Sequence, residues 1–196
     1  MNDQLEAAAM AIREGELVVY PTETVYGLGG DALDPGAIER VYEVKGRDRS
    51  DPLSMAVPSI EAARDYIESS AVVTSFMEAF LPGPITVIAE KTDRVPDVLT
   101  SGRNRVGLRI PDHDLALDLL NRVSPITATS ANVSGSESVT SVEELSPRIR
   151  DGVATVIDGG ETPGLESTVV DPGLGTIHRR GAKADEVADW LRVHDR

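Results

Sequence analysis

YPTETVYGLGG, residues 20–30, is the stretch from which the fold of this 196-residue chain can be worked out. The apolar run at residues 16–20 predicts a short strand, which Pro21 ends because proline has no N–H to give to a β-ladder. Thr22 and Thr24 then flank Glu23, and three glycines close the stretch. We expect a glycine turn with positive φ that lets the backbone approach a small ligand, although an ordinary hydrophilic turn has the same composition.

Beyond this stretch, segments with helical periodicity alternate with short apolar runs that are typical of strands. We expect helices at residues 3–14, 34–45, 58–67, 71–80, 112–122 and 183–193, with another after the capping box of Ser141 and Glu144. We expect strands at residues 16–20, 53–57, 85–90, 106–110, 126–129, 153–157, 168–170 and 176–178. The imperfect alternation predicts one α/β domain over residues 1–196, with a mixed parallel and antiparallel sheet and flanking helices.

The composition is strongly acidic, with 33 Asp and Glu against 19 Lys and Arg and a net charge of −14. This charge argues against broad binding to a nucleic-acid backbone and suggests adaptation to high salt. No apolar run approaches the roughly 20 residues of a membrane span, and the N-terminal segment lacks the pattern of a secretion signal. With no cysteine in the chain, we expect a cytoplasmic protein without disulfides and without membrane contact.

Two cationic features are candidate anion sites. Lys45-Gly46-Arg47 stands at the end of a predicted helix, where the cations either complement the helix dipole or clamp a phosphate. Arg109 stands next to the end of the otherwise apolar strand expected in VGLRIP, where alternation puts it on the same face as Gly107. A buried guanidinium needs a partner, so Arg109 is expected to face a cavity that holds an anion, the alternative being a solvent-facing edge.

Hydroxyl-rich loops follow several predicted strands. Residues 127–135, TATSANVSG, and residues 164–170, GLESTVV, both place hydroxyls beside glycines, as ordinary Asx and Ser/Thr turns also do. Ligands of open α/β sheets bind at such strand ends, so the combination suggests a site for an anionic nucleotide and a small polar substrate. The sequence has neither a GxxxxGK[ST] nor a GxGxxG motif, and its three histidines are scattered.

Taken in order, YPTETVYGLG, VYEVKGRDRSDPL, VGLRIP, TSANVSG, GLESTVVD and RRG resemble the Sua5/YrdC/YciO family over about residues 17–181. The resemblance implies a twisted α/β fold with a deep, positively charged central cavity. It also implies L-threonylcarbamoyladenylate synthase activity, a nucleotidyl transfer that uses L-threonine, bicarbonate and ATP with Mg²⁺. The product would serve N6-threonylcarbamoyladenosine formation at tRNA position 37, through a separate transferase complex and with a tRNA contact as a further implied interaction.

The resemblance also implies roles for individual residues, all at positions of its motifs. Catalysis and phosphate binding fall to Lys45, Arg47, Ser130 and Asn132, and L-threonine binding to Thr24, Arg109 and Ser167. Further nucleotide contacts are expected at Asp51, Ser134, Thr140 and Arg179. The sequence departs from the family pattern at Asp51, Ala56 and Arg105, where asparagine, histidine and a small hydroxyl residue occur in relatives. The short C-terminal segment is expected to make this a single-domain member.

Two other functions share parts of this pattern. A YciO-like RNA- or nucleotide-binding protein would use the same basic cavity, but such relatives lose parts of the Lys-x-Arg and Ser-x-Asn pairs, and both pairs are present here. A carbamoyl-transfer domain of a hydrogenase-maturation protein belongs to much larger chains. The sequence therefore favours the synthase.

Overall fold

The computed structural model describes residues 2–194. Its helices are α1 Asn2–Arg13, α2 Pro35–Lys45, α3 Ile60–Ala63, α4 Ala71–Phe80, α5 Asp97–Thr100, α6 Asp114–Arg122, α7 Pro147–Asp151 and α8 Ala184–His194, with the 3₁₀ turn η1 at Val142–Glu144. Its strands are β1 Val18–Tyr20, β2 Gly27–Gly29, β3 Ser54–Ala56, β4 Ile67–Glu68, β5 Ile85–Lys91, β6 Arg105–Arg109, β7 Ile126–Ser130, β8 Thr155–Val156, β9 Thr168–Asp171 and β10 Thr176–Arg179.

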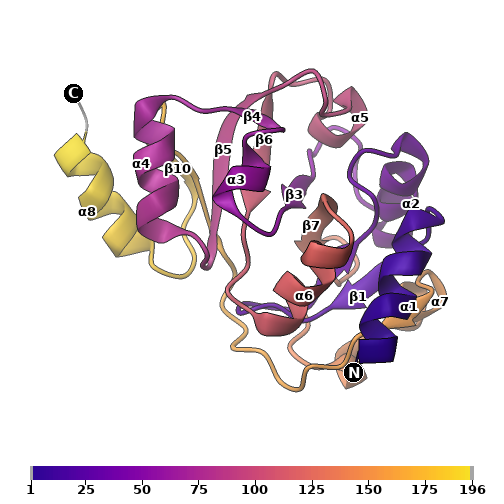
Figure 1. The fold of residues 1–196 in the computed structure, drawn as a ribbon. Coiled ribbons are helices and arrows are strands. Elements are labelled where there is room, and N and C mark those ends of the chain that lie inside the picture. The colour runs from indigo at the N-terminus through magenta and orange to yellow at the C-terminus, as the bar shows by residue number, and fades with distance from the viewer. Residues whose placement is uncertain (1, 195–196) are drawn as a thin grey trace.

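Within residues 2–194 the strands form one sheet in the order β10-β9-β5-β6-β3-β7-β2-β1-β8, and β4 pairs with β5 beside this path. The pairs β1–β8, β3–β6 and β5–β9 are parallel and the others are antiparallel. The expected mixed α/β sheet is therefore confirmed. In Figure 1, α4 and α8 lie at the β10 end, and α1, α2 and α7 lie at the β1 end.

Two apolar clusters fill the two faces of the sheet. The smaller packs α1 and α6 over Val18, Tyr20 and Ile126. The larger lies on the other face and includes Val19, Met55 and Leu108, which alternate along their strands with residues of the first face. The strict inward and outward alternation fixes the register, because a shift by one residue would exchange the two faces.

The glycine turn expected at residues 27–30 is wrong. Gly27–Gly29 forms β2, which lies between β1 and β7 and has no positive φ. A Cβ at Gly27 would lie 2.8 Å from Cζ of Tyr20, so the glycine makes room for the tyrosine ring on the paired strand. Close packing inside the sheet, and not turn geometry, explains this glycine.

Two other expected helices are shorter than the sequence pattern suggested. α3 ends at Ala63, and Ile67 belongs to β4, where it pairs with Lys91 of β5. The capping box of Ser141 and Glu144 is present, but it begins the single 3₁₀ turn η1 instead of an α-helix. In both segments the cap is local, whereas the length of the helix depends on which strands and loops pack beside it.

Candidate functional site

A cavity of about 710 Å³ opens on the face of the sheet that carries α1 and α6. Small residues on three neighbouring strands form its floor, because Ser54 of β3 is in register with Gly107 of β6 and with Ala128 of β7. A Cβ at Gly107 would collide with Oγ of Ser54. The missing side-chain volume at these adjacent positions hollows the sheet face.

The cavity is cationic although the chain is acidic. Its lining includes two carboxylates, Glu166 and Asp171, and five arginines: Arg47, Arg103, Arg105, Arg109 and Arg179. Hydroxyls from β1, β3, β5, β7 and the loops complete the polar lining. Guanidinium groups and hydroxyls arranged around a hollow are suited to an anionic ligand with several oxygens, such as a nucleotide phosphate.

The end of α2 positions Arg47. Asp34 caps the start of the helix by accepting from the N–H groups of Gly36 and Ala37, and Gly46 ends it in the left-handed conformation with φ 59°. The reversal at Gly46 turns Arg47 into the cavity, where its Nε and Nη2 donate to the carbonyls of Asp51 and Pro52 at 3.1 Å each. These bonds hold the guanidinium at the cavity wall.

Lys45 lies behind the cavity wall and is 1% exposed. Its Nζ donates to the carbonyls of Ser130 and Asn132, at 2.5 and 2.7 Å, so it joins α2 to the loop after β7. Burial, and to a smaller extent the nearby Arg47, lower the pKa of Lys45 to about 8, while Glu166 opposes the decrease. Its expected contact with phosphate stays a prediction, because Lys45 is not among the lining residues.

The last residue of β7 and the loop that follows it place the Ser-x-Asn pair at two depths. Ser130 lines the cavity, whereas Asn132 is 8% exposed and donates from Nδ2 to the carbonyls of Val133 and Ser136. Oδ1 of Asn132 is buried and has no hydrogen-bond partner among the described residues.

The three residues expected to bind threonine all line the cavity. Nη2 of Arg109 donates to Oγ1 of Thr24 at 3.3 Å, and Oγ of Ser167 lies 3.0 Å from Oγ1 of Thr86. Arg109 also forms an ion pair with Glu23 at 2.7 Å, and both side chains are close to nine-tenths buried. Arg109 thus lines the cavity, and its anionic partner in this structure is Glu23, so its expected contact with a bound anion stays a prediction.

The four further nucleotide contacts expected from the resemblance separate into two groups. Arg179 lines the cavity, but Asp51, Ser134 and Thr140 are not among the lining residues. Asp51 and Ser134 are exposed, and Oγ1 of Thr140 bonds to Glu144 at 3.1 Å. Their contacts with a nucleotide stay predictions.

The structure also places the remaining departures from the family pattern. Ala56 is buried in β3 beside Arg109, with which it is in register. Arg105 lines the cavity and forms an ion pair with Asp171, which is 1% exposed. The arginine at position 105 therefore supplies the charge that a buried carboxylate needs.

Sequence reasoning missed Glu23, Glu166 and Tyr20 as parts of the site. Tyr20 lines the cavity, and burial raises its pKa to about 12, with Arg109 and Glu23 acting in opposite directions. The position of Glu23 between the two threonines of the YPTET stretch was a sequence signal that could have identified it as part of the site. Nothing local marks Glu166, because its partners come from distant loops.

The fold and the cavity define an α/β protein with an arginine-lined hollow on one face of a mixed sheet. A family model for Sua5, YciO and YrdC, described as telomere recombination, matches residues 10–181. The chain therefore belongs to the Sua5/YrdC/YciO family.

Individual relatives agree with this assignment. The chain is 42% identical to the threonylcarbamoyl-AMP synthase of Pyrococcus abyssi over 174 residues, which cover 86% of this chain and 50% of that protein. The structure of P. abyssi Sua5 complexed with L-threonine has a TM-score of 0.87 and 39% identity, covering 93% of this chain and 56% of that one. Escherichia coli YciO has a TM-score of 0.84 and 26% identity, covering 93% and 91%. The chain spans about half the length of the P. abyssi relative.

A membrane-spanning helix is not found in the part of the chain that the structure describes. Within residues 2–194, every helix is too short or too polar to cross a bilayer.

Proposed function

We propose that this chain is an L-threonylcarbamoyladenylate synthase, which makes threonylcarbamoyl-AMP and pyrophosphate from L-threonine, bicarbonate and ATP. The observation that carries this proposal is the arginine-lined cavity of about 710 Å³, which contains Arg47, Arg109, Ser130 and Ser167 at the positions of the family motifs. Support also comes from relatives named threonylcarbamoyl-AMP synthase and from a related structure with L-threonine. Because residues 2–194 share one sheet, we treat them as one catalytic domain.

The proposed reaction has two steps. The amine of threonine attacks bicarbonate and forms a carbamate with loss of water. A carbamate oxygen then attacks the α-phosphorus of ATP, and the bond from that phosphorus to the β-phosphate bridging oxygen breaks, releasing pyrophosphate. Since each encounter joins two anions, the main tasks of the protein are charge neutralisation and alignment.

The residues around the cavity fit these tasks. Arg109, with Thr24 and Ser167 nearby, would hold the carboxylate and hydroxyl of threonine at one end. Arg47 and Ser130 would donate to the phosphates, with Lys45 and Asn132 shaping the loop that carries Ser130. Asp51, Ser134, Thr140 and Arg179 remain proposed contacts of the nucleotide.

Mg²⁺ is proposed to enter with ATP. Within the described residues, groups of three or more histidine, cysteine, aspartate and glutamate side chains that could hold a metal are absent. The two cavity carboxylates, Glu166 and Asp171, each form an ion pair with an arginine. The ion would therefore be held by the phosphate oxygens, where it would neutralise the leaving pyrophosphate.

The product is a reactive mixed anhydride, which needs an acceptor. We propose that a separate transferase complex receives it and modifies tRNA, with a direct tRNA contact at the cationic cavity mouth. Because the proposed pathway uses ATP and tRNA, we propose that the protein acts in the cytoplasm.

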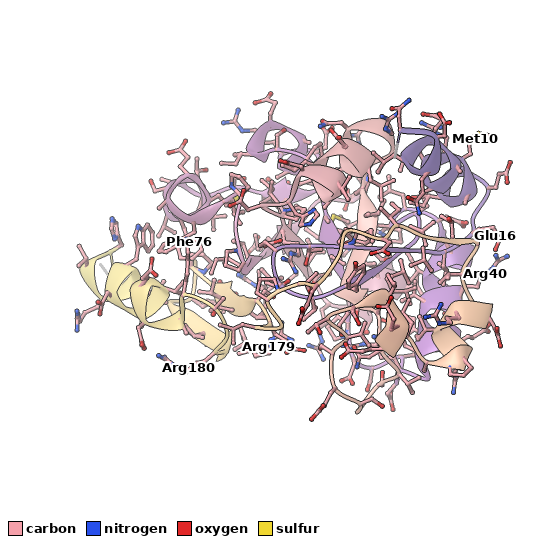
Figure 2. All side chains as sticks on the ribbon, turned by 90° about the horizontal axis from the view of Figure 1, so that it is seen from below. Met10, Glu16, Arg40, Phe76, Arg179 and Arg180 are labelled. Carbon is pink, nitrogen blue, oxygen red and sulfur yellow. The ribbon has the colours of Figure 1, made fainter. Side chains whose placement is uncertain are left out.

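The test is formation of the AMP adduct and pyrophosphate by the purified chain, with threonine, bicarbonate and ATP omitted in turn. We expect product only when all three are present, and ATP binding without product would instead favour a nucleotide-binding protein. Arg47→Ala should lower pyrophosphate release about 100-fold or more, since it removes a charged donor at the reacting phosphate. Arg40→Ala is the matched control, because Arg40 pairs with Glu16 at 2.6 Å on the side of the molecule away from Arg179, as Figure 2 shows.

A further inference from the structure

Glu166 is a carboxylate that faces the cavity but has no role in the proposed chemistry. It stands in the loop before β9, and its side chain is 42% exposed. Oε1 accepts from the hydroxyl of Ser138 at 2.6 Å, and Oε2 lies 3.0 Å from Nη1 of Arg179. The carboxylate of Glu166 thus binds a hydroxyl donor and a guanidinium that come from two separate segments.

Each nitrogen of the Arg179 guanidinium has a partner as a result. Besides its ion pair with Glu166, its Nε donates to the carbonyl of Ser167 at 3.1 Å and its Nη2 donates to Oγ of Ser167 at 3.0 Å. All three nitrogens of the guanidinium therefore have partners within residues 166–167. The guanidinium has five N–H donors, so a phosphate can reach Arg179 without breaking all three contacts, but it competes with Glu166 for the charge of the arginine. The half-exposed ion pair with Glu166 is the weakest of the three interactions.

Ser138 is occupied in the same way. It belongs to the loop that follows Ser130 and Asn132, and its side-chain bond to Glu166 ties this loop to the loop before β9. A backbone bond from Thr162 N–H to the carbonyl of Thr140, at 2.8 Å, joins the same two loops. Release of Glu166 would therefore free two donors without separating the loops.

We propose that Glu166 is an internal stand-in for a substrate phosphate, which holds Arg179 and Ser138 in the empty site and is displaced when Mg-ATP binds. A carboxylate and a phosphate compete for the same donors, because both accept from guanidinium and hydroxyl groups. The negative charge of Glu166 also opposes the approach of the triphosphate. Glu166 therefore lowers nucleotide affinity and acts as a positioning residue through Arg179 and Ser138. The inference rests on the proposed function.

Glu166→Gln tests this inference, because glutamine keeps the shape and can still accept from Ser138 but carries no charge. Isothermal titration with Mg-ATP should give a Kd about two- to five-fold lower for the variant, the range expected when a half-exposed ion pair is removed from the free state. The gain should shrink in high salt, because salt screens exposed pairs. Glu161→Gln is the control, since Glu161 is exposed on the same loop and outside the cavity lining.

A second variant separates competition from a structural role. In an Arg179→Gln background, Glu166→Gln should lower the Kd for Mg-ATP by clearly less than it does in the unmodified chain, because the part of its effect that acts through Arg179 is gone and only the parts from Ser138 and from direct charge repulsion remain. Equal or weaker Mg-ATP binding by Glu166→Gln, in a chain that melts like the unmodified one, would overturn the inference. If the unmodified chain binds no Mg-ATP, the proposed function fails, and the inference fails with it.

Discussion

Lys45 offers the sharpest test of the site's electrostatics. It is 1% exposed, and burial followed by the nearby Arg47 lowers its pKa from 10.5 to about 8. This decrease means that folding disfavours the charged amine, relative to the neutral amine, by about 3 kcal/mol. Because the amine has two carbonyl acceptors, the ion is held in place despite this cost.

The sign of the pH dependence follows from proton binding. Below about pH 8 the amine is charged in the folded and unfolded chains, and folding bears the full cost of burying it. Between about pH 8 and 10.5 the unfolded chain binds more protons, so the free energy of unfolding rises with pH. Lys45→Met removes this titration, so the difference between the two proteins should change by about 3 kcal/mol over that range.

The chain is well suited to a direct measurement. It has only three lysines, so an NMR titration of lysine side chains labelled at Cε gives three signals, with Lys91 and Lys183 as internal references. Urea unfolding of both proteins at several pH values supplies the stability difference. If Lys45 helps to neutralise phosphates, pyrophosphate release should also fall as pH rises through about 8. A Lys45 midpoint above pH 10, or a stability difference that does not vary with pH, would refute the reasoning.

Three further predictions concern the buried pair, the β2 glycine and the surface charge. Glu23→Gln should lower the free energy of unfolding by about 3 kcal/mol in urea titrations, because it leaves the guanidinium of Arg109 buried without its carboxylate. Adding Arg109→Met should recover part of this loss, and an additive double variant would contradict the pairing. Gly27→Ala should cost about 1–3 kcal/mol through its contact with the Tyr20 ring, and Tyr20→Leu should relieve it; a harmless Gly27→Ala would contradict that packing. With 33 acidic against 19 basic residues, the melting temperature should be higher in molar KCl than in low salt, and equal values would contradict adaptation to salt.

Local chemistry predicted much of the fold. Asp34 and Gly46 mark the two ends of α2 from the sequence, because an N-cap side chain and a left-handed C-cap satisfy backbone groups within a few residues. The hydrophobic alternation likewise predicted most of the strands. The family motifs contain Arg47, Arg109, Ser130 and Ser167, all of which line the cavity, and each of these residues lies at or next to the end of a helix or strand.

The sequence by itself determined both ends of α2, the approximate positions of most helices and strands, and the chemical groups that stand beside them. Only the tertiary structure decided that Gly27 lies in a strand against Tyr20, that Glu23 pairs with Arg109, and that Glu166 holds Arg179. Capping and periodicity act over neighbouring residues. Burial of a charge or removal of a side chain's volume depends on partners that strand pairing brings together from distant parts of the chain.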